Sequence, residues 1–116
     1  MEYILLIYSS EADGKKRPEA ENQQIVQEYM SFTEDLTKSG KNKGGNPLEP
    51  ATTATTVRVR NGKTTVTDGP FAETKEQLGG YYLVEAKDID EAISIAARIP
   101  GSKHGSIEVR PIRKLS

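Results

Sequence analysis

The chain begins with an unbroken apolar run, from Tyr3 to Tyr8. In a β-strand, successive side chains point to opposite faces. This run therefore gives two apolar faces, one centred on Leu5 and the other on Leu6. A strand that is apolar on both faces is typical of a central strand covered on both sides.

The apolar spacing then changes from strand-like to helical. Residues 9–17 are polar and are expected to form a loop. A helix is predicted over 19–39, with Pro18 suited to its first turn and Gly40 to its end. The apolar positions that recur at helical spacing are Ile25, Tyr29, Phe32 and Leu36.

Two signals predict a β-hairpin in the middle of the chain. Residues 54–60 and 63–68 are strand-like, and the dipeptide Asn61-Gly62 between them favours a two-residue turn. This turn sets Arg60 opposite Lys63, Val59 opposite Thr64 and Val57 opposite Val66. The three valines then share a face that is expected to be buried. By the same alternation Asp68 falls on that inward face.

The rest of the chain repeats the pattern of strand, helix and strand. Residues 81–86 are predicted as a strand after the Gly79-Gly80 pair, which favours a bulge or a close backbone approach. Asp88 and Glu91 have the spacing of a capping box, and the apolar stripe behind them predicts a second helix that ends at Pro100. Residues 106–112 alternate as a final strand.

The predicted order is therefore strand, helix, hairpin, strand, helix, strand. It indicates an α+β, ferredoxin-like fold with an antiparallel sheet. Two helices cover only one face of such a sheet, whereas the first strand is apolar on both. An identical chain packed sheet against sheet would bury the second face, which predicts a homodimer with cavities near its interface.

Composition limits the class of protein. The chain has 116 residues, of which 34% are hydrophobic, and is expected to form a single domain over 1–116. Its net charge of −1 gives no electrostatic case for nucleic acid or an anionic membrane as a partner. The apolar start is too short to span a bilayer. The chain has no cysteine, which fits a reducing cytoplasm. With one histidine it cannot complete a metal site of nitrogen and sulfur ligands, and no spacing of carboxylates indicates the remaining alternative, a magnesium site; no metal and no cofactor are therefore predicted.

One long segment resembles a known family. Residues 67–86 read TDGPFAETKEQLGGYYLVEA, with LLIY near the start of the chain and GSIEVRPI near its end. These stretches are similar to the YCII-related family, in particular its DGPF branch, and the similarity spans 1–112. The resemblance implies a dimeric α+β barrel. Some members of the wider family act on small ring compounds such as lactones and chlorinated hydroquinones.

A pair of residues known from the family is not carried over. Better-studied YCII proteins bear a histidine on the first helix and an aspartate just before the proline that ends the second, proposed as an acid–base dyad. The matching positions here lie near Tyr29 and Ile99. Neither side chain can perform that chemistry in the same way, so the dyad is not predicted for this chain.

Two residues are predicted as catalytic, each with a plainer alternative. Asp68 can act as a general base at the mouth of a dimer cleft, or can simply hold the Asp-Gly-Pro turn by accepting backbone N–H groups. His104 is the only histidine, and can act as acid or base or be an ordinary surface residue of a polar loop.

Five further residues are predicted to bind a ligand. Arginine can bind an anionic group, charged loop residues can line a cleft, and one of two successive tyrosines can stack on an aromatic ring while the other packs in the core. The alternative for the charged residues is an ordinary solvated surface. The five are Arg58, Glu73, Lys75, Tyr81 and Tyr82.

Two functions follow as hypotheses. The first is an enzyme for a small organic acid, lactone or phenol, which binds in a homodimer cleft and uses Asp68 with His104 or Arg58. The second is a non-catalytic binding or regulatory module. Genes of the DGPF branch are often found beside alternative sigma factors, so the resemblance implies that such a module acts with a sigma factor.

Overall fold

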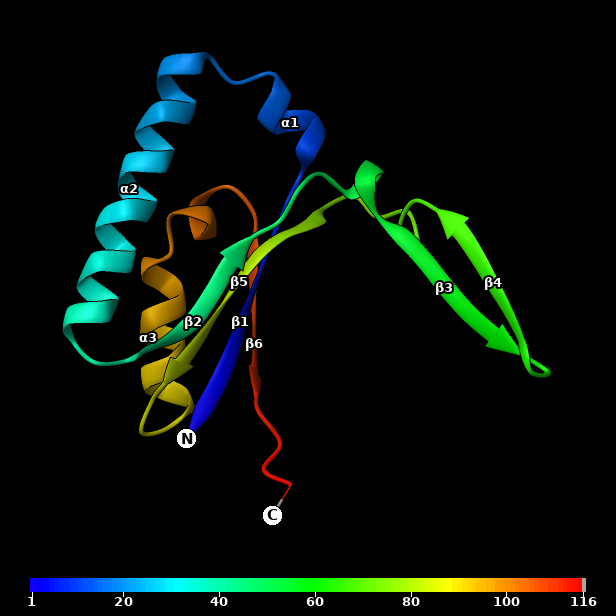
Figure 1. Ribbon diagram of the computed structural model, residues 1–116. Coiled ribbons are helices and arrows are strands. Elements are labelled where there is room, and N and C mark those ends of the chain that lie inside the picture. Colours follow the sequence, from blue (N-terminus) through cyan, green and yellow to red (C-terminus); the bar gives the residue numbers. More distant parts are fainter. Residues whose placement is uncertain (116) are drawn as a thin grey trace.

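Four antiparallel strands form the main sheet, in the order β2-β5-β1-β6 (Figure 1). The computed structural model describes residues 1–115. This strand order is that of a ferredoxin-like fold, as the sequence predicts. The strands are β1 (Glu2–Ser9), β2 (Asn42–Pro47), β5 (Gln77–Glu85) and β6 (Ser106–Pro111).

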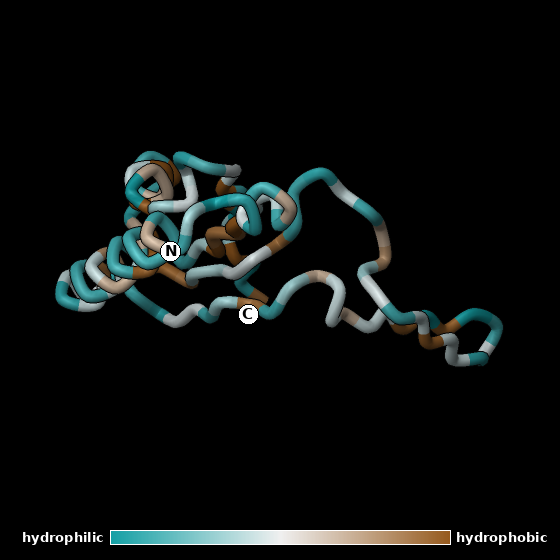
Figure 2. Tube along the Cα trace, turned by 90° about the horizontal axis from the view of Figure 1, so that it is seen from above, coloured by the Kyte–Doolittle hydropathy of each residue, from teal (hydrophilic) through white to brown (hydrophobic). Residues whose placement is uncertain are grey.

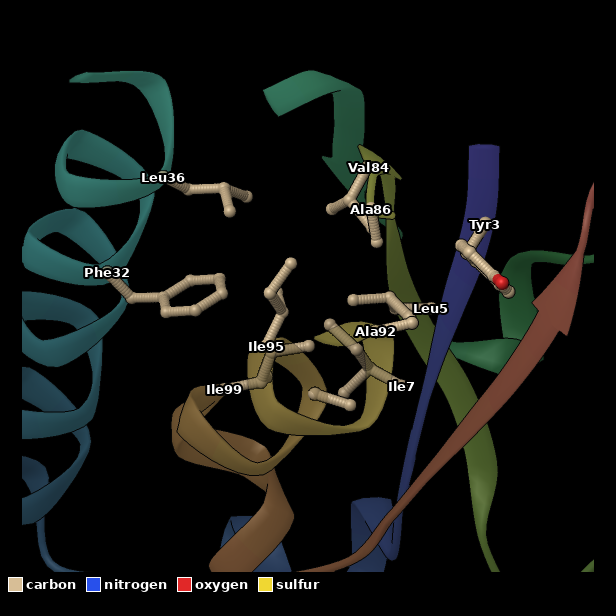
Figure 3. Close-up of a cluster of buried hydrophobic side chains, with 11 residues drawn as sticks. Tyr3, Leu5, Ile7, Phe32, Leu36, Val84, Ala86, Ala92, Ile95 and Ile99 are labelled. Carbon is tan, nitrogen blue, oxygen red and sulfur yellow. The ribbon is translucent and has the colours of Figure 1, made fainter. Parts of the chain in front are cut away.

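Helices α2 (Glu19–Lys38) and α3 (Ile89–Arg98) cover one face of this sheet. Figure 3 shows Phe32 and Leu36 of α2 directed towards Ile95 of α3 and Leu5 of β1. These side chains belong to one buried cluster. The remaining helical segments are short: α1 (Glu11–Lys15), within the predicted loop, and the 3₁₀ turns η1 (Ala51–Thr53) and η2 (Pro100–Lys103).

The capping box at the start of α3 is confirmed. The backbone N–H of Glu91 donates to the Asp88 carboxylate (2.9 Å). In return the Glu91 carboxylate accepts from the backbone N–H of Lys87 (2.9 Å), and it also pairs with the Lys41 ammonium (2.9 Å). These charged and polar partners hold the pKa of Glu91 below its ordinary value.

Strand β2 was not predicted, and its residues explain why. It contains Gly44 and Gly45 and ends at Pro47, a composition that indicates a loop. It lies at the edge of the sheet, where such residues are tolerated. Gly45 has φ +154°, and an added Cβ would lie 2.5 Å from the carbonyl oxygen of Tyr81. The glycine therefore allows β2 to approach β5.

The Gly79-Gly80 pair has the role that the sequence predicts. The register of β1 and β5 shifts between Ile7 and Tyr8, opposite these glycines, which marks a bulge. A Cβ at Gly80 would also lie 3.0 Å from the carbonyl oxygen of Asn46. The pair therefore combines a bulge with a close backbone approach.

The predicted hairpin forms a separate two-stranded sheet, β3 (Thr55–Arg60) and β4 (Lys63–Asp68), which we call the arm. Its register is confirmed, and Asn61 and Gly62 have the positive φ angles that the turn requires (53° and 74°). The arm is not the second strand of the main sheet, because β2 occupies that position. It extends away from the sheet in both views (Figures 1 and 2).

The valines of the arm are not buried within the chain. Val57, Val59 and Val66 share one face, which we call the valine face, and they are 59%, 58% and 62% exposed. The prediction that this face is buried is therefore wrong for the single chain. The alternation of the strands fixed which residues share a face, but it could not show whether the rest of the chain covers that face.

The main sheet also has an uncovered face, on the side away from the helices. We call it the open sheet face. Leu6 lies opposite Tyr81 and Ile4 opposite Leu83, so these residues share that face. Its apolar residues are half-buried, whereas Leu5 and Val84 on the helix side are fully buried. The open sheet face comprises Ile4, Leu6, Tyr8, Tyr81 and Leu83.

Candidate functional site

Asp68 lies at the end of β4, opposite Thr55, and is exposed. Among the hydrogen bonds of residues 1–115, none joins a backbone N–H to its carboxylate. Instead the turn is held by Gly69, whose N–H donates to the carbonyl oxygen of Ala54 (2.7 Å) and whose carbonyl accepts from the Thr56 hydroxyl (2.8 Å). The Asp68 carboxylate is thus free of the turn role and faces solvent on the side of the valine face.

His104 follows η2 and is also exposed. Its backbone N–H donates to the carbonyl oxygen of Gly101 (3.1 Å). In the part of the chain that the structure describes, no hydrogen bond or ion pair connects His104 with Asp68. One chain alone therefore does not assemble these two predicted catalytic residues into a pair.

The charged residues predicted to bind a ligand are solvated. Arg58 lies on the face of the arm opposite the valine face, and Glu73 and Lys75 lie in the connection from β4 to β5; all three are exposed. Their neighbour Glu76 is different, because it is half-buried and its carboxylate accepts from the Ser106 hydroxyl of β6 (2.9 Å).

Polar contacts hold the segments that join the arm to the rest of the chain, which we call the root of the arm, and no pattern in the sequence predicts these contacts. The backbone N–H of Glu11 donates to the Gln77 side-chain oxygen (2.9 Å), and the Glu11 carboxylate accepts from the backbone N–H of Ala51 (2.9 Å). The backbone N–H of Leu48 donates to the carbonyl oxygen of Gly79 (2.9 Å). These bonds join α1, η1 and β5, which are distant in sequence.

The two tyrosines of β5 point to opposite faces, as predicted. Tyr81 lies on the open sheet face, where its hydroxyl accepts from the Asn46 side-chain amide (3.2 Å). Tyr82 lies on the helix side, with its ring 5.2 Å from that of Phe32 in an edge-to-face arrangement and its hydroxyl 2.7 Å from that of Thr33. Tyr82 is thus mainly a packing residue, whereas Tyr81 is available at the open face.

Tyr29 of α2 contacts the segment that follows Ile99. The backbone N–H of Gly101 donates to the Tyr29 hydroxyl (3.1 Å). Burial raises the pKa of Tyr29, an effect that the Gly101 hydrogen bond opposes and the nearby Tyr82 reinforces. At neutral pH the phenol therefore keeps its proton, and it can donate a hydrogen bond but cannot act as a base.

We expect Tyr29→Phe to lower the free energy of unfolding by about 1 kcal/mol, because the N–H of Gly101 loses its acceptor. The folded-state pKa of Tyr29 lies above 10.0. Its contribution to stability is therefore complete below the unfolded-state pKa and disappears as the pH rises through the folded-state value. Urea unfolding at about pH 8 and about pH 11 measures both effects, and the variant should lose stability less steeply than the wild type between them.

Tyr81→Phe is the matched control, since it removes a hydroxyl from the open sheet face, where its hydrogen-bond partner is the exposed side chain of Asn46. If both variants change stability equally at both pH values, the role assigned to the bond between Tyr29 and Gly101 is wrong.

Two shallow hollows of the single chain lie away from Asp68 and Tyr81. One of ≈ 340 Å³ lies between α2 and η2, next to Glu28, Arg98 and Lys103, and one of ≈ 400 Å³ lies at the start of α3. Among residues 1–115, no three acidic or histidine side chains gather as a metal site. Neither of these two hollows is lined by Asp68 or Tyr81.

None of the helices within 1–115 combines the length and the apolar character needed to cross a membrane.

Comparison with known proteins is consistent with this fold. The chain is 36% identical over 114 residues to an uncharacterised protein of Rhizobium meliloti (strain 1021), covering 97% of this chain and 92% of that protein. The fold of this chain is similar to that of 5-chloro-2-hydroxyhydroquinone dehydrochlorinase from Burkholderia phenoliruptrix AC1100, solved in complex with 2,5-dihydroxybenzoquinone. The TM-score is 0.54 and the identity 18%, over 97% of this chain and 94% of that one. The model of the YCII-related domain matches residues 1–116, and the chain therefore belongs to the YCII-related family.

Proposed function

We propose that this protein binds a small molecule in a cleft of a homodimer, formed where the open sheet faces of two copies meet. The observation that carries the proposal is the open sheet face itself. It is apolar along the central strand β1, and within the described chain neither helix covers it. Packing a second sheet on this face would remove its apolar surface from water, as in dimeric α+β barrels.

The residues around this face favour a small aromatic or quinone-like ligand. Tyr8 and Tyr81 offer two aromatic rings that can stack on a planar ligand. Arg110 lies opposite Ile4 on β6 and is exposed, so its guanidinium can pair with an anionic oxygen. The dehydrochlorinase of similar fold was solved with such a ring bound, which supports the same class of ligand here.

Asp68 is the proposed acid–base residue, with His104 or Arg58 assisting. All three are exposed, so their side chains are free to meet a ligand or a second copy. Within the DGPF branch that the segment 67–86 resembles, the protein would then be an enzyme. The alternative is a non-catalytic module that binds the same ligand without turnover.

The dimer is tested by light scattering at micromolar concentration, where the wild type should have twice the chain mass of 12.7 kDa. Leu6→Glu should be monomeric, because it places a carboxylate at the centre of the apolar interface. Val26→Glu is the matched control, since Val26 is an exposed apolar residue on α2. It should remain dimeric, and a monomeric wild type would refute the proposal.

Ligand binding is tested by calorimetry with 2,5-dihydroxybenzoquinone. The wild type should bind it, and Tyr81→Ala should bind it more weakly because a stacking ring is lost. Asp68→Asn distinguishes an enzyme from a non-catalytic module when turnover of hydroxyquinol substrates is assayed in parallel with binding. If the protein is an enzyme, this variant should lose turnover and still bind the ligand. Binding without turnover by the wild type would identify the non-catalytic module.

A further inference from the structure

We propose that the arm packs its valine face on a second copy of this chain and carries Asp68 to the cleft formed with that copy. The inference rests on the proposed homodimer and adds a second contact to it. The cleft of the dimer would then include a carboxylate delivered by the arm.

The chemistry of the arm is one-sided. The valine face carries three large apolar side chains, each more than half exposed. The opposite face carries the basic residues Arg58, Arg60 and Lys63. A two-stranded hairpin is only marginally stable in water by itself, and usually needs another surface against its apolar side. The valines are therefore expected to be covered when the protein is assembled.

The arm and the open sheet face lie on the same side of the molecule. In Figure 1 the helices α2 and α3 stand on one side of the main sheet, and the arm extends to the other; Figure 2 shows the same separation from above. A second copy that packs on the open sheet face therefore approaches on the side where the arm projects. This position favours a second copy, and not an unrelated protein, as the occupant.

The chain exposes more surface than a compact monomer of its mass, which is expected of a chain that packs against a partner. The chain exposes 8335 Å², whereas a compact monomer of this mass exposes about 6,200 Å². Its radius of gyration is 16.2 Å, against about 13 Å for a compact chain of this length. The excess of about 2,000 Å² exceeds the roughly 800 Å² per partner of a standard stable interface, and an obligate homodimer uses more.

Hydrogen bonds within the single chain hold the root of the arm. The bonds of Glu11 with Gln77 and Ala51, and the bond between Glu76 and Ser106, tie both ends of the arm to the main sheet. An arm held in this way loses less conformational freedom on association than a flexible loop does. It therefore presents the valine face at a fixed place relative to the open sheet face.

Asp68 would be carried into the contact by the same geometry. It lies on the face of Val66 and Val57, two residues beyond Val66 on β4, and opposite Thr55. A surface that covers the valines would therefore extend to the Asp68 carboxylate or border it. The carboxylate then lines the cleft from the arm, while the open sheet faces supply its apolar wall.

The first test compares two neighbouring residues of β4. Val66→Asp places a charge on the valine face, and Thr65→Asp places the same charge on the opposite face, where Thr65 is also exposed. Analytical ultracentrifugation of the full chain should show a dimer dissociation constant raised about 100-fold or more by Val66→Asp, and little changed by Thr65→Asp. Equal effects of the two variants would overturn the inference.

The second test does not depend on the folding of a charged variant. A benzophenone amino acid is placed at Val59 or, as the control, at Arg58, its neighbour on the opposite face of β3. Irradiation of the purified dimer should give crosslinked dimers from position 59 and few from position 58. Crosslinks within one chain, or equal yields at both positions, would overturn the inference.

The outcomes separate this inference from the proposed function. If the wild type is dimeric and the changes on the valine face do not weaken the dimer, only the arm contact is refuted. The proposed cleft between the open sheet faces then still stands. A monomeric wild type refutes the dimer itself, and the arm contact with it.

Discussion

Replacing Leu5 with alanine is expected to lower the free energy of unfolding by about 3 kcal/mol. Leu5 is fully buried at the centre of β1, among the side chains of the main cluster (Figure 3). Alanine removes the buried carbons and leaves a cavity that neighbours on β5 and α3 fill only in part. A loss of this size is a large part of the 5–15 kcal/mol that typically stabilises a domain.

Leu6→Ala is the matched control for this prediction. Leu6 is the next residue on the same strand, but it points to the open sheet face and is half-buried. Urea unfolding is measured at one low protein concentration, because the stability of the proposed dimer would depend on concentration. At a concentration at which the chains are separate, Leu5→Ala should be clearly less stable than Leu6→Ala. If Leu6→Ala costs as much there, the core does not lie on the side of Leu5.

Local signals in the sequence predicted the parts of the fold that local physics determines. Asn61-Gly62 predicted the register of the arm, because both residues tolerate the positive φ angles of a two-residue turn. Asp88 and Glu91 predicted the start of α3, because their side chains satisfy free N–H groups at a helix end. Each signal acts within a few residues and needs no knowledge of distant contacts.

Tertiary contacts determined what the sequence did not predict. Strand β2 is held to β5 by backbone pairing, and its glycines fit because two backbones approach each other. The valines of the arm alternate as they would in a buried strand, and the alternation is the same whether the cover comes from this chain or from a second copy. The sequence therefore identified the shared apolar face correctly, but the prediction that this face is buried is wrong for the single chain.

The same limit applies to the candidate site. The register of the arm places Asp68 on the side of Val66, as predicted. Whether that side borders a cleft depends on contacts beyond the arm itself, which no spacing of residues encodes. Tyr29 shows the converse case. Its apolar position predicts core packing, yet its hydroxyl also meets the Gly101 amide, 72 residues away in the chain.

Gly105→Ala is expected to lower the free energy of unfolding by about 2 kcal/mol, through overpacking and not through a cavity. A Cβ at Gly105 would overlap the carbonyl oxygen of Tyr8 and lie 3.0 Å from the Cα of Ser9. Both contacts are to backbone, which cannot move aside as a flexible side chain does. The start of β6 must therefore shift away from the end of β1, where Tyr8 lies opposite Ser106.

Gly79→Ala is the control, because its added Cβ would lie 3.9 Å from the nearest atom, the carbonyl oxygen of Ile7. Urea unfolding should show a clear loss for Gly105→Ala and little change for Gly79→Ala. The NMR signal of the neighbouring His104 ring should also move in the Gly105 variant only, since that loop is displaced. Two variants of equal stability would mean that β6 does not depend on the close approach of Gly105, and that the loop bearing His104 is not fixed by it.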